Sequence, residues 1–474
     1  MGRGKHFFPT NRPLVCVQGL GFVGVGMSVA VASALDKRGN PFFNVVGIDL
    51  DTPLGRFRID SINSGKFPFR CTDEKMVDFF TRAIQRGNLK ASSDETLYAL
   101  ADYIIVDIPL DITFNAEKND YDIDLSPFRK AVRSFGERIK PECLVIIETT
   151  VPPGTCERTV LPELWDCFRQ RGLDGKKILL AFSYERIMPG KDYLDSIINF
   201  WRVFSGVNEE SCNRCESFLS KVINTRDFPL RKLKSLVSAE TAKVLENSYR
   251  ATNIALMEEW GRFAEALNVD LFEIIDAIRI RPTHSNIRQP GFGVGGYCLT
   301  KDPLFAGWSA KNFYGLKELD FPFCTQAIAK NMAMPLVTVN YAEKLLEGNL
   351  SRKKILLLGV SYRQDVADTR FSPSEVFVKE AQKRGAQVVC HDPLVSFWDE
   401  LKIGVLNDIP SIADFDLAVF AVPHREYTLL DLARWARESR VRVIDANRVL
   451  TDKQRFEFVD AGGRLFSIGR GENI

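Results

Sequence analysis

The sequence lacks an excess of charge of either sign. Its 63 basic and 61 acidic residues leave a formal net charge of +2 over 474 residues. A protein that attracts nucleic acid through its overall field needs a strongly basic surface, so no nucleic-acid partner is expected. An anionic ligand would have to be met by a local site. The hydrophobic fraction of 45% is that of an ordinary globular protein, and the length predicts two or three domains.

A disulfide framework is also missing. The ten cysteines are scattered along a long chain, which fits free thiols in a reducing cytoplasm, the compartment that we expect. Cys212 and Cys215 form a lone CxxC motif, and no second cysteine or histidine pair stands near it to complete four zinc ligands. We therefore expect no metal, and we place these two cysteines on the surface of a helix.

No low-complexity segment occurs, and the one stretch that imitates a membrane segment is broken by glycines. Basic residues precede an uncharged run from Leu14 to Leu35, as in a signal peptide or a membrane span. The glycines within this run have a better use as part of a nucleotide-binding loop. We expect the run to form the first strand and helix of a soluble domain, and no membrane partner.

That loop carries a dinucleotide fingerprint. An apolar strand at 14–18 leads into GLGFVG, a helix of small residues is expected at 27–35, and a strand at 44–48 ends in an aspartate. The glycines permit a tight turn and close approach of a pyrophosphate, which sits at the helix N-terminus. The aspartate would accept hydrogen bonds from the adenosine ribose and repel a 2′-phosphate, which favours NAD over NADP. The cofactor-binding residues are Gly19, Gly21, Phe22, Val23, Gly24 and Asp49.

Strands continue to alternate with helical stretches after the fingerprint. Apolar runs at 103–109, 144–150 and 178–182 predict an α/β fold with a doubly wound parallel sheet. Ligands bind such sheets beyond the carboxyl ends of the strands. Thr150 and Glu185 stand just past two of these ends and are therefore candidates for the site. The alternatives are that Thr150 caps a helix and that Glu185 is solvated.

A long helix and a glycine-rich loop follow. One uninterrupted helix is predicted from Leu236 to Leu267, a length typical of a domain connection or a dimer seam. Lys243 and Asn247 lie four residues apart and share one face of it, toward either a site or the solvent. Further on, GFGVGGYCLTKD places four glycines before Cys298. A thiol after such a loop and beside a cation is where a nucleophile is expected, and the alternative is a buried free cysteine.

After Leu350 the alternation of strands and helices restarts. Strands at 353–359, 387–392, 416–422 and 442–445 predict a second Rossmann-like unit. Its first loop lacks GxGxxG, so no second dinucleotide is expected. Arg363 and Arg370 stand near a strand end, where they suit a phosphate, unless they are ordinary surface arginines.

Six motifs occur in order: GLGFVG, ETTVPPGT, YERIMPG, AETAKVLENSYRATNIA, GFGVGGYCLTKD and DTRFSP. Together they resemble the nucleotide-sugar 6-dehydrogenases, the family that acts on UDP-glucose, UDP-N-acetylhexosamines and GDP-mannose. The resemblance implies an NAD-binding Rossmann domain (1–227), a central helical and dimerisation domain with the cysteine loop (228–349) and a UDP-sugar-binding Rossmann-like domain (350–474). It also implies a homodimer or higher homo-oligomer that supplies precursors for polysaccharide biosynthesis.

The same resemblance implies a four-electron oxidation of the sugar's primary alcohol to a carboxylate, which gives a uronic acid, with two NAD used in turn. Cys298 would capture the aldehyde as a thiohemiacetal that is oxidised to a thioester. Lys243 would stabilise the developing oxyanion, and Asn247 would be the hydrogen-bonding asparagine beside it. Asp302 would act as acid and base, and Thr150 and Glu185 would position water. Thr150 and Lys301 would also contact the cofactor. The substrate-binding residues would be Glu185, Lys243, Asn247, Gly295, Gly296 and Arg370.

Departures from the family pattern affect the choice of sugar. Pro189 matches the N-acetylhexosamine branch, whereas the Tyr297-Cys298 pair is more like UDP-glucose enzymes. Asp107 departs from an apolar segment near the nicotinamide, and Glu258 stands where asparagine is usual. We expect a UDP-N-acetylhexosamine (UDP-GlcNAc or UDP-ManNAc) 6-dehydrogenase, with UDP-glucose and then GDP-mannose as alternatives. Other classes are a two-electron 3-hydroxyacid-type dehydrogenase, which needs no such cysteine, and a non-catalytic nucleotide-sugar-binding protein.

Overall fold

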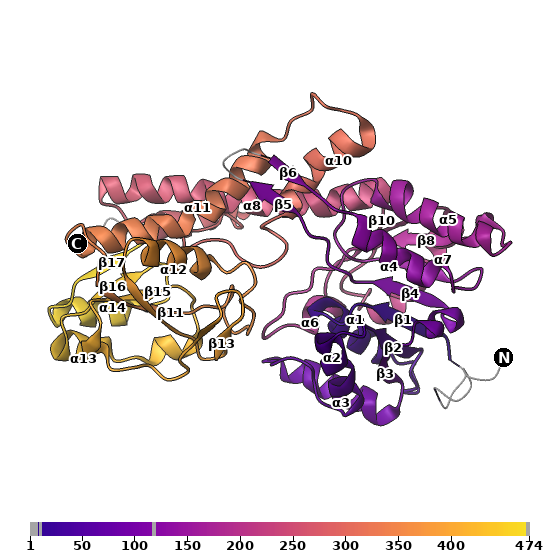
Figure 1. Cartoon of the computed structure of the whole chain (residues 1–474), viewed down its shortest axis with the longest axis horizontal. Helices are drawn as coiled ribbons and strands as arrows, with labels where there is room; N and C mark the ends of the chain where they lie inside the picture. The colour runs from indigo at the N-terminus through magenta and orange to yellow at the C-terminus, as the bar shows by residue number, and fades with distance from the viewer. Residues whose placement is uncertain (1–7, 9–11, 116–119, 471–474) are drawn as a thin grey trace. The chain divides into compact units, whose positions relative to one another are not determined.

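The chain forms two compact units, each built around one sheet. The structure, a computed structural model, describes residue 8 and residues 12–115 and 120–470 (Figure 1). The first unit comprises Met1–Leu245 and Phe305–Asp320, and the second comprises Glu246–Leu304 and Phe321–Ile474. The chain thus passes from the first unit to the second after Leu245, returns to the first unit for Phe305–Asp320, and then continues in the second.

The first unit contains an eight-stranded sheet with the order β10-β9-β8-β7-β4-β1-β2-β3. Its neighbouring strands are parallel except β8 and β9. From β3 to β8 the order is that of a dinucleotide-binding fold, which binds its ligand where the order reverses, between β1 and β4. The strands are β1 (Leu14–Gln18), β2 (Asn44–Ile48), β3 (Leu89–Ser92), β4 (Tyr103–Val106), β7 (Leu144–Ile147), β8 (Leu179–Phe182), β9 (Val203–Gly206) and β10 (Arg231–Lys232).

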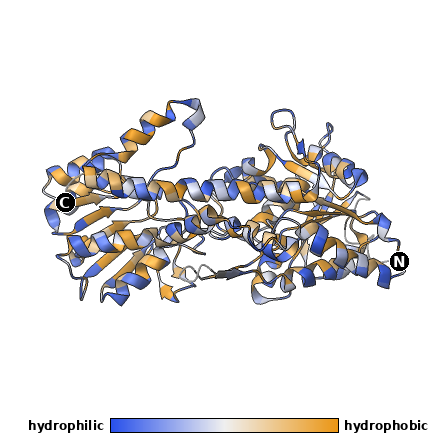
Figure 2. Cartoon of the chain, turned by 90° about the horizontal axis from the view of Figure 1, so that it is seen from above, coloured by the Kyte–Doolittle hydropathy of each residue, from blue (hydrophilic) through white to orange (hydrophobic). Residues whose placement is uncertain are grey.

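Helices cover both faces of this sheet, because successive residues of each strand enter opposite cores. Val15 and Val17 of β1 pack with α1 (Phe22–Ala32), α3 (Glu74–Arg86) and α7 (Glu209–Val222). Cys16 lies in the other core, with α4 (Ser126–Gly136) and α5 (Leu161–Gln170). Burial on both faces explains why the strands are continuous apolar runs, and Figure 2 shows hydrophobic strands between helices of mixed character.

The second unit contains a five-stranded parallel sheet with the order β12-β11-β15-β16-β17. Leu357 of β11 packs with α11 (Pro322–Leu345) and α12 (Pro373–Lys383). Leu356 packs with α13 (Leu432–Glu438) and α14 (Asp452–Asp460) on the other face. The predicted pair of doubly wound sheets is thus confirmed. The strands are β11 (Lys354–Leu358), β12 (Gln387–His391), β15 (Leu417–Phe420), β16 (Arg442–Asp445) and β17 (Leu465–Ser467).

The long helix α8 (Leu236–Leu267) begins in the first unit and ends in the second. Its bounds agree with the prediction, because no proline and only one glycine, Gly261, interrupt its 32 residues. In the second unit it packs closely on α11 through the small side chains of Ala251, Ala255 and Ala327. Asn331 of α11 donates a hydrogen bond to the carbonyl of Ala251 at 3.0 Å. The remaining elements of this region are α9 (Leu271–Arg279) and α10 (Phe305–Tyr314).

Two local predictions were wrong. The helix expected at 27–35 begins at Phe22 and ends at Ala32, because Gly21 is already its N-terminal cap and Gly24 lies in its first turn. Cys212 and Cys215 do lie on a helix, α7, but both are buried in the core and not on its surface. They share the helix face that carries Phe218, and this face packs on the sheet.

Within the described residues, no helix combines the length and the apolar character needed to cross a membrane.

Candidate active site

The fingerprint loop leaves room for a dinucleotide in the first unit. Gly19 has φ +92°, and a Cβ on it would lie 2.6 Å from the carbonyl oxygen of Asp107. A Cβ on Gly24 would lie 1.8 Å from the carbonyl oxygen of Gly19, so both glycines are required by close packing. Nothing lies within 4 Å of a Cβ placed on Gly21. That open side, at the N-terminus of α1 and beside Phe22 and Val23, fits a pyrophosphate.

Asp49 directly follows β2 and faces the same loop. Its carboxylate accepts N–H hydrogen bonds from Leu20 at 3.3 Å and from Leu50 at 2.8 Å. The guanidinium of Arg58, on α2 (Pro53–Asn63), lies 3.2 Å from it. The position agrees with a ribose-binding carboxylate. Arg58 was missed by the sequence analysis, because nothing local in the chain marks it as the neighbour of Asp49.

Lys243 and Glu185 come together in the first unit. The ammonium of Lys243 donates to the carbonyl oxygen of Glu185 at 2.8 Å and lies 4.0 Å from its carboxylate. It also lies 5.3 Å from the centre of the Tyr184 ring. Both charged side chains are buried, so the solvated alternative was wrong for each of them. Thr150, also buried, follows β7, the strand next to β8 that precedes Glu185.

Glu240, one turn before Lys243 on α8, shapes the loop that follows Thr150. Its carboxylate accepts hydrogen bonds from the backbone N–H groups of Gly154 and Cys156, the latter at 2.8 Å. Burial raises the pKa of Glu240 to about 7, against the lowering effect of these hydrogen bonds. The loop is therefore held by α8. The sequence signal that could have indicated this contact is an acid three residues before Lys243, on the same face of the predicted helix.

The second unit holds the cysteine loop and its acid. Cys298 is exposed, so the alternative of a buried cysteine was wrong. Its carbonyl oxygen accepts hydrogen bonds from the backbone N–H groups of Lys301 at 3.2 Å and Asp302 at 2.9 Å, which form a tight turn. The carboxylate of Asp302 accepts from the amide of Asn247 at 2.7 Å and from the ammonium of Lys301 at 2.9 Å.

Asn247, Lys301 and Asp302 form a buried polar triad. Their exposed fractions are 1%, 4% and 0%, so the alternative that Asn247 lies on a solvated face was also wrong. The side-chain oxygen of Asn247 is buried and finds no hydrogen-bond partner among the described residues. An unpaired buried acceptor indicates a missing partner, and a hydroxyl group or water at this point would supply it.

The glycines before Cys298 are required by packing against the second sheet domain. A Cβ on Gly295 would lie 2.8 Å from the carbonyl oxygen of Phe371 and from atoms of Tyr362 and Pro373. A Cβ on Gly296, which has φ +81°, would lie 2.8 Å from the Tyr362 ring. The direct contact of these two glycines with a substrate stays a prediction.

Arg370 lies beside the same loop. Its guanidinium is 6.0 Å from the centre of the Tyr297 ring and donates hydrogen bonds to both carboxylate oxygens of Asp368, the shortest at 2.6 Å. The ammonium of Lys301 lies 4.5 Å from the same ring. The Tyr297 ring is therefore near two cations. Its place in the sequence before Cys298 did not predict these contacts.

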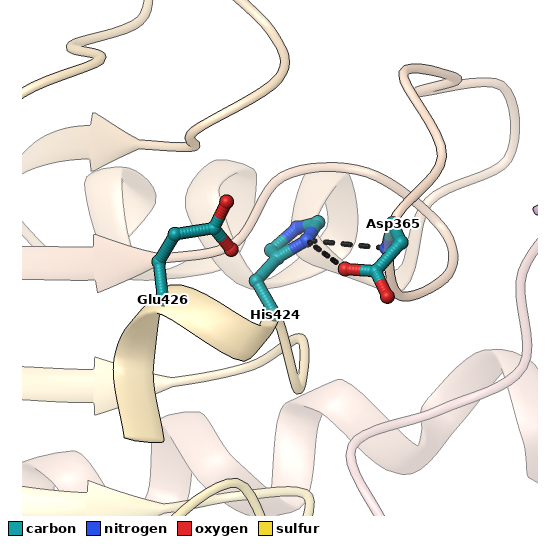
Figure 3. Close-up of side chains that lie close together, drawn as sticks. All are labelled: Asp365, His424 and Glu426. Atoms are coloured by element: carbon teal, nitrogen blue, oxygen red, sulfur yellow. Dashed lines mark hydrogen bonds and ion pairs between the residues drawn. The ribbon is translucent and has the colours of Figure 1, made fainter. Parts of the chain in front are cut away.

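One further group of side chains could in principle hold a metal ion. Atoms of Asp365, His424 and Glu426 lie within 4.8 Å of one another in the loops after β11 and β15 (Figure 3). Both nitrogens of His424 already have protein partners. Nε2 lies 3.2 Å from Asp392, and Nδ1 accepts the backbone N–H of Asp365 at 3.3 Å. Because the protein satisfies this ring, the group gives no ground for a metal.

Three family models match consecutive parts of the chain. The NAD binding domain of the UDP-glucose/GDP-mannose dehydrogenase family matches residues 13–224, its central domain matches 237–332, and its UDP binding domain matches 356–452. The chain belongs to this family. It is therefore an NAD-dependent nucleotide-sugar dehydrogenase, and the predicted family, enzyme class and cofactor are confirmed.

Full-length relatives agree with this membership. A UDP-N-acetyl-D-mannosamine dehydrogenase of Methanocaldococcus jannaschii is 29% identical over 97% of both chains. The solved structure of a UDP-D-ManNAc dehydrogenase from Pyrococcus horikoshii has 26% identity and a TM-score of 0.79, and the match covers 97% of this chain and 100% of that one. An NDP-N-acetyl-D-galactosaminuronic acid dehydrogenase from Methanosarcina mazei has 25% identity and a TM-score of 0.77, with 98% and 96% covered.

Proposed function

We propose that the dehydrogenase oxidises carbon 6 of a UDP-N-acetylhexosamine from a primary alcohol to a carboxylate, with two NAD consumed in turn. The observation that carries the chemistry is the exposed thiol of Cys298 one turn from the buried triad of Asn247, Lys301 and Asp302. The similarity to enzymes named for UDP-N-acetyl-D-mannosamine, together with Pro189 in the segment after Glu185, supports an N-acetylated sugar.

Cys298 is the proposed nucleophile. NAD, when bound, accepts a hydride in each of the two oxidations. The sulfur adds to the carbonyl carbon of the aldehyde formed in the first oxidation, which gives a thiohemiacetal. Loss of a second hydride from the same carbon gives a thioester, and water cleaves the C–S bond to release the carboxylate and restore the thiol. A covalent intermediate divides the oxidation into easier steps and retains a reactive aldehyde.

Asp302 is the proposed acid and base. Its hydrogen bonds from Asn247 and Lys301 hold the carboxylate in one orientation, as a group that transfers a proton requires. The free acceptor oxygen of Asn247 suits a substrate hydroxyl or the hydrolytic water. The ion pair also gives Lys301 a positioning role, in addition to the cofactor contact expected from the family.

Lys243, Glu185 and Thr150 are the proposed groups of the first unit. Lys243 supplies a positive charge for a developing oxyanion, an interaction that a buried site strengthens. Its contact with Glu185 fixes the direction of the ammonium group. Glu185 and Thr150 offer acceptors for a water molecule beyond the ends of two adjacent strands.

The domain roles follow the sequence prediction. Residues 1–227 bind NAD, 228–349 carry the cysteine loop and the dimer contact, and 350–474 bind the nucleotide with Arg370. A homodimer is supported by an exposed apolar stripe on α8, since soluble surfaces rarely expose so many large apolar side chains in a row. The stripe consists of Tyr249, Leu256, Trp260, Phe263 and Leu267, spaced as in a helix seam.

UDP-glucose is the second candidate substrate, favoured by the Tyr297-Cys298 pair. NADH formation against UDP-ManNAc, UDP-GlcNAc, UDP-GalNAc, UDP-glucose and GDP-mannose decides between them. We expect two NADH per sugar and a uronate product. One NADH per sugar with an aldehyde or ketone product would instead indicate the two-electron class.

The Cys298→Ala variant tests the covalent step. We expect NAD binding to persist and uronate formation to fall by at least about a thousandfold, as is usual for loss of a nucleophile. Cys324→Ala, at a half-buried cysteine of the same unit, is the matched control. Unchanged turnover of Cys298→Ala would remove the covalent mechanism, and no turnover of any sugar by the wild type would favour a non-catalytic binding protein.

A further inference from the structure

Three acidic side chains end neighbouring strands of the first unit. Asp107 directly follows β4, Glu148 directly follows β7, and Glu185 follows β8. Their exposed fractions are 8%, 0% and 7%. We call these three residues the carboxyl cluster. Two buried cations contact it: Arg202 lies 2.9 Å from Glu148, and Lys243 contacts Glu185 as described above.

Several carboxyl oxygens of the cluster have no hydrogen-bond partner among the described residues. Both carboxyl oxygens of Asp107 and the second oxygen of Glu148 are buried, and they find no hydrogen-bond partner among the described residues. The hydroxyl of Ser183, the residue directly after β8, also finds no partner among the described residues. Native proteins rarely leave buried acceptors unpaired, so several at one place indicate a partner that binds there.

The position of the cluster identifies the partner. The peptide carbonyl of Asp107 abuts Gly19, the first glycine of the fingerprint. In a sheet with this strand order, a dinucleotide crosses the switch point between β1 and β4. Asp49 would hold the adenosine half at the end of β2, and the nicotinamide half would then lie beyond the ends of β4, β7 and β8, where the cluster is.

The charges of the cluster are only partly balanced. Burial raises the pKa of Asp107 well above its ordinary value, the negative charges of Glu148 and Glu185 raise it further, and only Arg202 lowers it. The phenol of Tyr193, which precedes α6 (Asp195–Ile198), also faces Asp107 and Glu185. Burial raises the pKa of Glu148 to about 7. The burial of three neighbouring carboxyl groups beside only two cations thus favours a proton within the cluster when no further cation is bound.

We propose that the carboxyl cluster selects the oxidised cofactor over the reduced one, with Asp107 releasing its proton to solvent when NAD⁺ binds. The nicotinamide ring is a cation in NAD⁺ and neutral in NADH. A buried carboxylate attracts the cation strongly, because the surroundings screen the pair poorly. Binding of NAD⁺ therefore exchanges the proton of the Asp107 carboxyl for the ring charge, whereas NADH binds to the protonated cluster without proton release.

The inference uses the NAD-binding domain and Asp107, and it does not depend on the proposed sugar. If the inference about the cofactor failed, the proposed sugar substrate would still stand. If the proposed sugar were wrong, the inference about the cofactor would still stand. The consequence for turnover is that NADH formed in the first oxidation is held less tightly than the NAD⁺ that must replace it.

Calorimetric titration of the full chain with NAD⁺ and with NADH tests the proposal without turnover. Titrations at pH 7 in phosphate and in Tris, which differ in ionisation enthalpy, give the number of protons released. We expect close to one proton per NAD⁺ and close to none per NADH. Below the pKa of Asp107, the affinity for NAD⁺ should rise about tenfold per pH unit while the affinity for NADH stays level.

Asp107→Asn keeps the shape of the side chain and removes the charge. We expect the ratio of the NADH and NAD⁺ dissociation constants to fall by at least about tenfold, and the proton release to disappear. Asp60→Asn, at an exposed aspartate of the same unit, should change neither quantity. Equal proton release for both cofactor forms in the wild type would overturn the proposal, even if the Asp107 variant failed to fold. An unchanged ratio in a folded Asp107→Asn would do the same.

Discussion

The amide of Asn247 on α8 donates a hydrogen bond to the carboxylate of Asp302 at 2.7 Å, and neither side chain is accessible to solvent. This bond ties the turn after Cys298 to the long helix. It leaves the other oxygen of Asp302 to Lys301. The helix therefore fixes the acid on which the proposed chemistry depends.

Asp302→Asn should keep the fold and lose the chemistry. The amide retains the size of the carboxylate, but it cannot take or give a proton and leaves Lys301 without its ion pair. We expect kcat to fall by roughly 10²- to 10⁴-fold, the usual contribution of a general acid or base, with a smaller change in the KM of the sugar. Steady-state kinetics over a pH range measure both. Asp399→Asn, at an exposed position of the same unit, is the control, and a similar loss there would point to general destabilisation.

Asp49 should decide between NAD and NADP. In Asp49→Ser the repulsion of a 2′-phosphate is removed, and Arg58, 3.2 Å away in the wild type, becomes free to bind it. We expect NADP to bind at least about tenfold more tightly than to the wild type, the effect of about 1.4 kcal/mol, and NAD more weakly. Fluorescence titration measures both affinities. Adding Arg58→Ala should cancel the gain, and a gain that survives would rule out Arg58 as its source.

The apolar stripe on α8 should hold the dimer. Trp260→Glu places a charge in the middle of the stripe. Loss of a central aromatic contact costs about 2 kcal/mol or more, so the dimer should weaken by at least about thirtyfold. Light scattering after size-exclusion chromatography measures the mass. Glu259→Ala, beside it on α8, should leave the mass unchanged. A variant that remains fully dimeric would place the interface elsewhere.

Glu258 should make stability depend on pH. Its side chain is buried, with Arg262 at 3.1 Å, and burial raises its pKa from 4.5 to about 7 despite that arginine. The folded state therefore binds the proton more tightly than the unfolded state. The free energy of unfolding should fall by roughly 3 kcal/mol as the pH rises from 4.5 to 7 and then stay level.

Glu258→Gln removes this titration. The variant should match the wild type below pH 4.5 and exceed its melting temperature at pH 8, which thermal unfolding at several pH values measures. Glu259→Gln, at the exposed neighbour, should follow the wild type throughout. Parallel profiles of the wild type and Glu258→Gln would show that Glu258 is ionised without cost.

The sequence predicted elements whose signals are local. The fingerprint with Asp49 combines a strand, a glycine turn and a second strand within 40 residues, and α8 is bounded by its own uninterrupted pattern. The burial of Cys212 and Cys215 could also have been predicted from the sequence, because Phe218 lies on the same face of the helix and marks that face as apolar. The family resemblance indicated Cys298, Asn247 and Asp302, and the structure places them around one turn.

Other features depend on residues that meet only after folding. Tyr362 lies 66 positions from Gly296 in the sequence. Neither segment contains a pattern that predicts that the Tyr362 ring occupies the space where a Cβ on Gly296 would lie. Arg58 beside Asp49 and the unpaired oxygens of Asp107 are of the same kind. Their energetic meaning comes from burial and from neighbours, which a linear pattern does not contain.

The packing of Gly295 and Gly296 against Tyr362, Phe371 and Pro373 has a consequence for how the protein is made. The ribosome completes the cysteine loop well before it completes the sheet domain that the loop packs against. A nascent chain that ends before residue 371 has no surface to order the loop around Cys298. The surroundings of the proposed nucleophile are therefore completed late, and a prematurely terminated chain that still contains Cys298 would carry the thiol on a loop without its packing partners.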